Sequence, residues 1–344
     1  MKLKTSLSMI TIGLLFSSTV IKAEDQFTNK NKTEIIMKLA KALKNKYVLV
    51  KEGEGFGEEL IHLNEQGAFS KSNSQRQFAY ELNSKLREIA NDKHLNVMPK
   101  RGLGGKIIGG PGPKMVQGSS MSNLPHIETE ILPGNVGVLT INDLLGTTSE
   151  IDKAMKELTS TDSLLIDVRQ CPGGDEKVVQ QLMSYFIPEN DTIIEMYQRD
   201  HEARLVKSKT LPVTNKRYLD KPIVVVTSAS TGSGCEEISF DIKYHKLGYL
   251  YGENTAGAGF ALFSGPIDLG YGLEANIPDT APKHPDYDFT FEKVGVAPDF
   301  TANSALAFDK AYQLVLSLML DKDKRNKTLT IIIRLYREIH KNFY

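Results

Sequence analysis

The sequence predicts an α/β protein in which a largely parallel sheet follows a helical N-terminal domain. Three observations support this class. From residue 133 onward, short β-branched apolar runs alternate with amphipathic stretches, as βα units do. Residues 24–98 instead repeat apolar side chains at helical spacing. Between these regions, residues 99–128 are rich in glycine and proline, which favours a connecting linker.

Residues 1–23 have the pattern of a secretory signal peptide and are not expected to join the fold. Lys2 and Lys4 form a basic start, residues 7–21 are mostly apolar, and Ala23 precedes two acidic residues. We expect cleavage after Ala23. The apolar run is short for a bilayer span. The mature protein is therefore expected to be secreted or periplasmic, without stable membrane insertion.

The N-terminal domain is predicted to contain amphipathic helices. One covers residues 33–43 and another residues 78–90, and both carry an apolar stripe. Clustered glycines within residues 53–57 predict a break between helices.

The remaining elements alternate. Strands are expected over residues 135–141, 163–169, 222–228 and 249–252. Helices are expected over residues 149–158, 177–186, 236–247 and 305–320. Residues 260–298 predict short strands, and residues 321–344 form a basic C-terminal tail to which the sequence assigns no function.

Composition excludes several function classes. The chain has 42 basic and 42 acidic residues among 344, so no bulk charge favours a nucleic-acid partner. No Walker or dinucleotide fingerprint stands in the required setting, and the seven histidines show no metal-ligand spacing. We therefore expect no cofactor and no metal. The two cysteines, Cys171 and Cys235, could bridge in an oxidising compartment, but their spacing leaves this open.

The segment TSASTGSGCEE, residues 227–237, joins a predicted strand to a predicted helix through small residues. N–H groups at a helix start attract negative charge, so a serine such as Ser233 could be a nucleophile with oxyanion donors beside it. The alternative is that Thr231 and Ser233 only cap the helix. Glu236 and Glu237 are expected to be charges that complement the helix dipole.

A second turn, DVRQCPGG at residues 167–174, also follows a buried strand. Ligands of open parallel sheets bind beyond the carboxyl ends of the strands. Both turns could therefore meet at one edge, with Gly173 and Gly174 turning N–H groups toward a ligand. The alternative is an ordinary strand-to-helix turn.

Four blocks in order carry a family resemblance. They are residues 167–174, residues 227–237, GENTAG at residues 252–257, and EKVGVAPD at residues 292–299. Together they resemble the S41 peptidases, the tail-specific or C-terminal processing family, in its retinoid-binding-protein-like and tricorn-core-like branch. The resemblance implies a crotonase-like (ClpP/crotonase) core over residues 129–320 behind an N-terminal helical bundle. No PDZ-like segment is evident.

The resemblance also implies the site residues. The family's nucleophile falls on Ser233, and its oxyanion donors fall on Gly234 and Gly173. The base falls on His94 and the carboxylate that orients it on Glu292, so catalysis would require the helical domain to pack against the core.

Two positions depart from the family pattern. Where one branch carries the lysine of a Ser/Lys dyad, this chain has Ala258, so a Ser/His/Glu mechanism is expected. Cys171 stands where the family usually has Asn or Gly.

The leading hypothesis is an exported serine peptidase that acts on extended peptide or protein substrates. The alternative is a non-catalytic binding protein for an apolar ligand or peptide on the same scaffold. A crotonase-like acyl enzyme would require a CoA-binding loop, which the sequence does not reveal. The oligomeric state cannot be inferred from the sequence.

Overall fold

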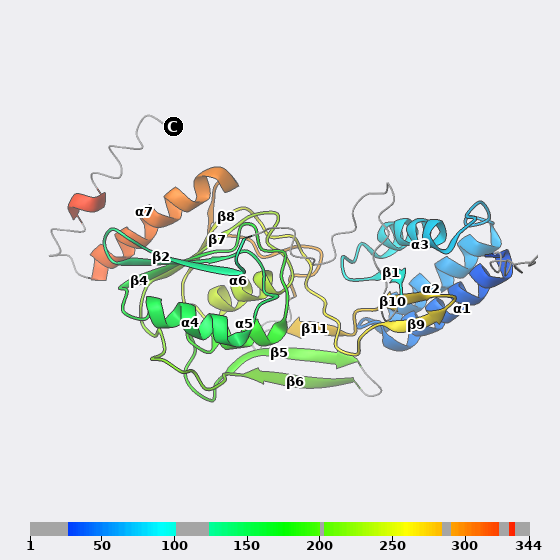
Figure 1. The fold of residues 1–344 in the computed structure, drawn as a ribbon, viewed down its shortest axis with the longest axis horizontal. Helices are drawn as coiled ribbons and strands as arrows, with labels where there is room; N and C mark the ends of the chain where they lie inside the picture. The colour runs from blue at the N-terminus through cyan, green and yellow to red at the C-terminus, as the bar shows by residue number, and fades with distance from the viewer. Residues whose placement is uncertain (1–26, 101–123, 200–202, 284–289, 323–329, 334–344) are drawn as a thin grey trace, which may run out of the picture.

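The computed structural model describes residues 27–100, 124–199, 203–283, 290–322 and 330–333. Figure 1 shows helices α1–α3 with short strands at one end and a larger sheet with helices at the other. The expected signal peptide, most of the linker and most of the C-terminal tail lie outside the described residues. Within the described part, no helix is both long and apolar enough to cross a bilayer.

Three helices form the N-terminal part, and their buried apolar faces share one core. Thr28 caps the first helix by accepting a hydrogen bond from the Asn31 N–H (3.3 Å). Ser74 caps the third in the same way with Gln77 (3.2 Å). The helices are α1 (Asn29–Lys46), α2 (Val50–Glu65) and α3 (Gln75–Ala90).

The predicted break at residues 53–57 was wrong, because α2 runs straight through it. A Cβ on Gly53 would lie 2.5 Å from the carbonyl oxygen of Leu43, and one on Gly57 would lie 3.0 Å from that of Ala40. Helices α1 and α2 therefore approach too closely for a side chain at either position. Packing between the helices outweighs the low helix propensity of glycine.

Residues 96–98 also differ from the helical prediction, because they lie in a strand. The strand is β1 (Asn96–Pro99), which pairs antiparallel with β10 (Leu273–Asn276), and β10 pairs with β9 (Ile267–Gly270). Val97 and Ala275 are buried in the core of the helices. A segment far along the chain thus completes the N-terminal part, which local periodicity cannot reveal.

The larger part is built on a six-stranded sheet in the order β12-β8-β7-β4-β3-β2. All neighbours are parallel except β2 and β3, which are antiparallel. The expectation of a largely parallel α/β sheet is confirmed. The strands are β2 (Ile127–Leu132), β3 (Val136–Ile141), β4 (Ser163–Asp167), β7 (Ile223–Thr227), β8 (Tyr249–Gly252) and β12 (Phe300–Thr301).

Helices cover both faces of this sheet, as Figure 1 shows for α4 and α5 on one side and α7 on the other. In β4, Leu164 and Ile166 join the core that contains residues of α4, α5 and α6, whereas Leu165 joins the core of α7. Burial on both faces explains why these strands are continuous apolar runs. The helices are α4 (Thr148–Leu158), α5 (Glu176–Met183), α6 (Gly234–Tyr244) and α7 (Ser304–Lys322).

A third sheet has the strand order β11-β5-β6. Of its strands, only β11 lies in a region, residues 260–298, where the sequence predicted short strands. It comprises β5 (Thr192–Arg199), β6 (Ala203–Lys209) and β11 (Thr280–Lys283). Tyr197 and Ala281 of this sheet pack against the N-terminal core. Arg199 donates to the carbonyl oxygens of Tyr47 and Lys44. The sheet therefore helps to hold the N-terminal helices against the rest of the chain.

The carboxyl ends of β4 and β7 are level with one another. Asp167, the last residue of β4, pairs with Val226, and β7 ends one residue later at Thr227. The turns that follow the two strands consequently leave the same edge of the sheet, where open α/β folds bind ligands.

Candidate active site

Ser233 ends the turn between β7 and α6. Its φ of 50° and ψ of −124° are unusual for a residue with a side chain, and such a conformation costs on the order of 1–3 kcal/mol. Glu236 accepts from the Ser233 N–H (2.9 Å), as in a capping box at the start of α6. The Ser233 hydroxyl oxygen Oγ lies 3.2 Å from Nε2 of His94. Thr231 does not cap α6, because its hydroxyl donates to the carbonyl of Val168 (2.9 Å).

His94 reaches this point from the N-terminal part of the chain. Helix α3 ends at Asn91, whose left-handed conformation (φ 49°) turns the backbone. The Asp92 carboxylate then accepts hydrogen bonds from the N–H groups of His94 (2.8 Å) and Leu95 (3.1 Å). Its second oxygen accepts from the Tyr47 hydroxyl (2.9 Å). Asp92 therefore determines where His94 points, a role that sequence reasoning missed although an Asp two residues before a turn N–H suggests it.

The imidazole of His94 is largely buried. Burial lowers the pKa of His94 below its usual 6.5, and the nearby charges of Asp92 and Glu236 oppose this effect. The Nδ1 atom is buried and has no hydrogen-bond partner among the described residues. The ring is thus neutral near pH 7, and Nδ1 is left available for one further partner.

Glu292 lies in the same neighbourhood but makes no direct hydrogen bond to His94 within the described part of the chain. Its Oε2 accepts from the N–H groups of Gly259 (2.7 Å) and Phe260 (2.9 Å). Its Oε1 is buried and unpartnered among the described residues. Burial, reinforced by the charge of Asp92, raises the pKa of Glu292 to about 7, while its two N–H partners oppose the rise.

The glycine turn after β4 lies directly against the Ser233 turn. A Cβ on Gly173 would be 2.6 Å from Cβ of Ser233 and 3.0 Å from the backbone nitrogen of Gly234. Gly173 has a φ of 110°, and Leu144 holds its carbonyl through an N–H hydrogen bond of 2.9 Å. Gly234 is the first residue of α6, so its N–H has no partner within the helix.

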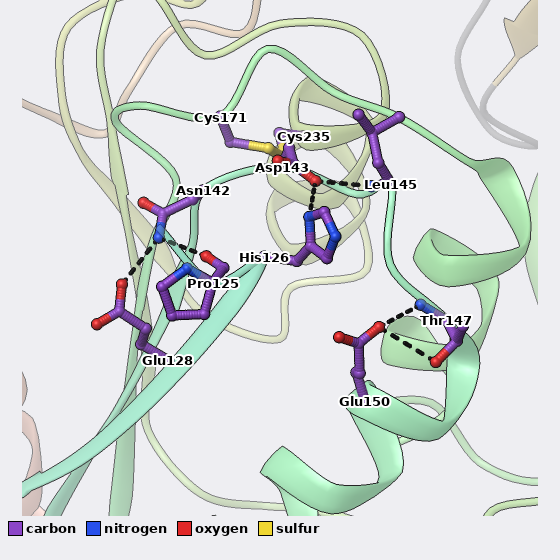
Figure 2. A network of polar contacts seen from close by, with 10 residues as sticks. All are labelled: Pro125, His126, Glu128, Asn142, Asp143, Leu145, Thr147, Glu150, Cys171 and Cys235. Carbon is purple, nitrogen blue, oxygen red and sulfur yellow. Dashed lines mark hydrogen bonds and ion pairs between the residues drawn. A yellow bond between two sulfur atoms is a disulfide. The ribbon is translucent and has the colours of Figure 1, made fainter. Parts of the chain in front are cut away.

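Several links join the two turns. The Gly232 N–H donates to the carbonyl of Cys171 (2.9 Å), and the Ser228 hydroxyl donates to that of Arg169 (2.6 Å). A disulfide connects Cys171 and Cys235, whose Cα atoms are 6.1 Å apart. The question that the cysteine spacing left open is answered by this bridge, which Figure 2 shows beside the segment that contains Asp143.

The structure places Glu236 and Glu237 in the first turn of α6, where acidic side chains were expected. Both side chains are buried, with exposed fractions of 0% and 6%. The Glu236 carboxylate accepts hydrogen bonds from the N–H groups of Ser233 (2.9 Å), Gly257 (2.6 Å) and Ala258 (2.7 Å). Glu236 therefore connects the turn that contains Ser233 to residues 257–258. The local sequence pattern did not suggest this connection.

Glu237 has the opposite environment. Burial and the charges of Glu176 and Asp241 raise the pKa of Glu237 well above its usual range. One of its oxygens has no partner among the described residues. It is therefore a buried protonated carboxyl beside the site.

A second histidine supports the segment next to the glycine turn. Nδ1 of His126 lies 2.5 Å from an Asp143 carboxylate oxygen, which also accepts from the Leu145 N–H (2.9 Å), as Figure 2 shows. The residue between them, Leu144, holds Gly173. His126 matched no motif in the sequence, and its role here is structural.

Other features of the described residues lie away from Ser233. No group of three or more His, Cys, Asp or Glu side chains among them is arranged to hold a metal ion. A cavity of about 910 Å³ opens where Ile223 begins β7 and Tyr249 begins β8, at the opposite end of the strands. Its lining mixes aromatic and charged side chains and includes neither Ser233 nor His94.

Comparisons with known proteins point to one family. Residues 135–302 match the family described as peptidase family S41, and residues 27–103 match the N-terminal domain of that family's peptidases in eukaryotic IRBP. A probable CtpA-like serine protease of Staphylococcus saprophyticus is 26% identical over 213 residues, which cover 58% of this chain and 40% of that protein. One from Staphylococcus epidermidis is 31% identical over 134 residues, 37% of this chain and 26% of that protein. The chain thus spans less than half of these relatives.

Solved structures with the same fold include three that cover most of this chain. Mature CPAF complexed with lactacystin has a TM-score of 0.59 at 13% identity and covers 90% of this chain and 99% of its own. A putative peptidase from Parabacteroides merdae has a TM-score of 0.58 at 14% identity, covering 85% and 97%. A photosystem II D1 C-terminal processing protease has a TM-score of 0.55 at 15% identity, covering 80% and 94%. From the sequence matches over both parts, the chain belongs to peptidase family S41.

Proposed function

We propose that this protein is a serine peptidase that hydrolyses peptide bonds of extended peptide or protein substrates through an acyl-enzyme. Ser233 is the nucleophile, His94 the general base and Glu292 the group that orients the base. The observation that carries the proposal is the 3.2 Å contact between Ser233 Oγ and His94 Nε2. That distance is short enough for proton transfer to a base.

The reaction follows from these positions. Neutral His94 removes the proton of the Ser233 hydroxyl as Oγ attacks the substrate carbonyl carbon. The carbonyl oxygen becomes an oxyanion, which the N–H groups of Gly234 and Gly173 stabilise. The imidazolium then protonates the leaving amine. A water molecule, activated by the same imidazole, releases the acyl group and restores Ser233.

The role of Glu292 rests on two unused atoms. His94 has a buried Nδ1 and Glu292 a buried Oε1, neither with a partner among the described residues. A triad requires a donor at Nδ1 and an acceptor that fixes the tautomer and stabilises the imidazolium. Glu292 supplies that acceptor, directly after a small movement or through one water molecule. Ala258, whose side chain cannot accept a proton, excludes the Ser/Lys alternative at its position.

The proposal includes the predicted organisation of the chain. Residues 1–23 are a signal peptide cut after Ala23, and the mature protein is exported. Residues 24–98 are an N-terminal helical domain that contributes the base. Residues 129–320 are a crotonase-like peptidase core that contributes the nucleophile and the oxyanion donors.

A fluorophosphonate probe tests the assignment, since it labels activated serines without a known substrate. We expect one label on Ser233 in the wild-type protein, none in Ser233→Ala and a sharply slower reaction in His94→Ala. His126→Ala is the matched control, because this histidine also contacts a carboxylate but lies outside the proposed triad. Labelling that is indifferent to both Ser233→Ala and His94→Ala would refute the proposal and favour a binding protein. Co-purified apolar ligand, without reaction at Ser233, would support that alternative.

A further inference from the structure

The disulfide occupies a particular position in the proposed site. Cys171 precedes Gly173 by two residues, and Cys235 follows Ser233 by two residues. Both cysteines have an exposed fraction of 0%. The bridge therefore connects the segment that carries one oxyanion donor to the helix that carries the nucleophile and the other donor.

Among the described residues, the hydrogen bonds between the two turns lie before the oxyanion donors in the sequence. The hydrogen bonds between the two turns involve the β4 side, through the carbonyls of Val168, Arg169 and Cys171. Beyond Cys171, the carbonyl of Gly173 accepts from Leu144 instead. Among the described residues, no hydrogen bond joins residues 172–174 to α6. The bridge is thus the last attachment between the two turns before the donors.

Reduction would change the spacing at this attachment. Without the covalent bond, the two buried sulfur atoms become non-bonded neighbours, which need more room in a close-packed interior. Glu236 holds α6 at its first turn, and Leu144 holds the glycine turn from its other side, so the bridge is the covalent link that sets the spacing between them. A misplacement of about 1 Å can lower a catalytic rate on the order of 100-fold.

We propose that Cys171 and Cys235 are positioning residues whose disulfide holds the Gly173 N–H against Ser233, so that the reaction is much faster in the oxidised protein. This inference rests on the proposed peptidase function. In the reductive step, a dithiol gives two hydrogen atoms to the two sulfurs and becomes a disulfide itself. The peptidase is therefore slow in a reducing compartment and gains activity where the bridge forms.

The experiment compares the full chain in its oxidised, dithiothreitol-reduced and reoxidised forms. Mass spectrometry after alkylation verifies two free thiols in the reduced form. A fluorophosphonate titration then separates the maximal rate of Ser233 labelling from the probe concentration at half-maximal rate. We expect reduction to lower the maximal rate about 100-fold, to leave the half-maximal concentration within about twofold and to be reversed by oxidation. Near-UV circular dichroism should show that the reduced protein stays folded.

The double variant Cys171→Ala/Cys235→Ala is the control. We expect it to react as slowly as the reduced wild type and to be indifferent to dithiothreitol. Equal labelling rates for the verified reduced and oxidised wild-type proteins would overturn the inference while leaving the peptidase proposal intact. Loss of folded structure on reduction would also overturn it, because the effect would then be global. Oxidised protein that is never labelled at Ser233 would instead refute the peptidase function itself.

Discussion

Replacing Glu236 by glutamine tests how the nucleophile turn is held. The side chain of Glu236 is completely buried. Its carboxylate accepts hydrogen bonds from four donor groups. One oxygen accepts from Ser233 and Ala258, and the other accepts from Gly257 and the Thr255 hydroxyl (2.6 Å each). Glutamine has one acceptor oxygen and an NH₂ group that can only donate.

The cost can be worked out for both orientations of the glutamine amide. With the NH₂ toward Ser233 and Ala258, two backbone N–H groups lose their acceptor. With the NH₂ toward Thr255 and Gly257, the Gly257 N–H loses its acceptor. The Thr255 hydroxyl, which already accepts from the Val296 N–H (2.7 Å), must also turn its own proton away from residue 236. A buried unsatisfied donor costs about 1–3 kcal/mol, and the remaining bonds weaken because their acceptor is neutral. We expect the free energy of unfolding of Glu236→Gln to fall by about 2–4 kcal/mol.

Glu237→Gln is the matched control, since Glu237 is the next residue of the same helix and is also buried. Its raised pKa keeps it protonated near neutral pH. Glutamine resembles a protonated carboxyl in shape and charge. We expect the free energy of unfolding at pH 7 to change by no more than about 1 kcal/mol.

Urea denaturation at pH 7, followed by circular dichroism, measures both variants. Fluorophosphonate labelling of Ser233 supplies the functional readout, and we expect the rate to fall on the order of 100-fold in Glu236→Gln only. If Glu236→Gln were as stable and as reactive as Glu237→Gln, the four donors around Glu236 would not hold the turn.

Three other predictions concern different parts of the molecule. Stability from the raised pKa of Glu237 is fully present below the usual 4.5 and is lost as pH rises through the raised value. Urea midpoints should therefore fall as the pH rises above 4.5, and less steeply in Glu237→Gln. Gly57→Ala should lower the melting temperature, because the added Cβ meets the backbone of α1. Gly55→Ala, whose Cβ has nothing within 4 Å, should instead raise the free energy of unfolding by up to about 1 kcal/mol. Equal effects of the two substitutions would contradict the close contact between α1 and α2. Asp92→Asn removes a charge that raises the pKa of His94, so the acid limb of the labelling rate against pH should move to lower pH, and an upward move would exclude this role.

The sequence located most of the central elements because their signals are local. The apolar runs that became β3, β4, β7 and β8 and the stripes that became α1, α3 and α4 are set by side chains close in sequence. The family resemblance also led to Ser233 and His94 as candidates. These two residues are separated by 139 positions in the sequence. Their roles remain proposals, but the structure brings the two side chains into contact.

Other features depended on partners far along the chain. The glycines of α2 were interpreted as a helix break because their reason, the backbone of α1, cannot be seen in residues 53–57. The sequence indicated only that Glu236 complements the helix dipole, because its donors at residues 255–258 come after the helix. Strand β5 buries the polar residues Glu195 and Gln198 beside its apolar ones, so it lacks the continuous apolar run of the central strands.

By itself, the sequence determined where most strands and helices of the central sheet form, that the sheet is largely parallel, and which small-residue turns follow its strands. The tertiary structure decided that the Ser233 side chain lies against His94, that Cys171 and Cys235 bridge, and that Glu236 is buried among donors. The physical reason is that hydrophobic periodicity relates residues that are only a few positions apart in the sequence. Hydrogen-bond partners and contacts between sulfur atoms depend on how distant segments pack.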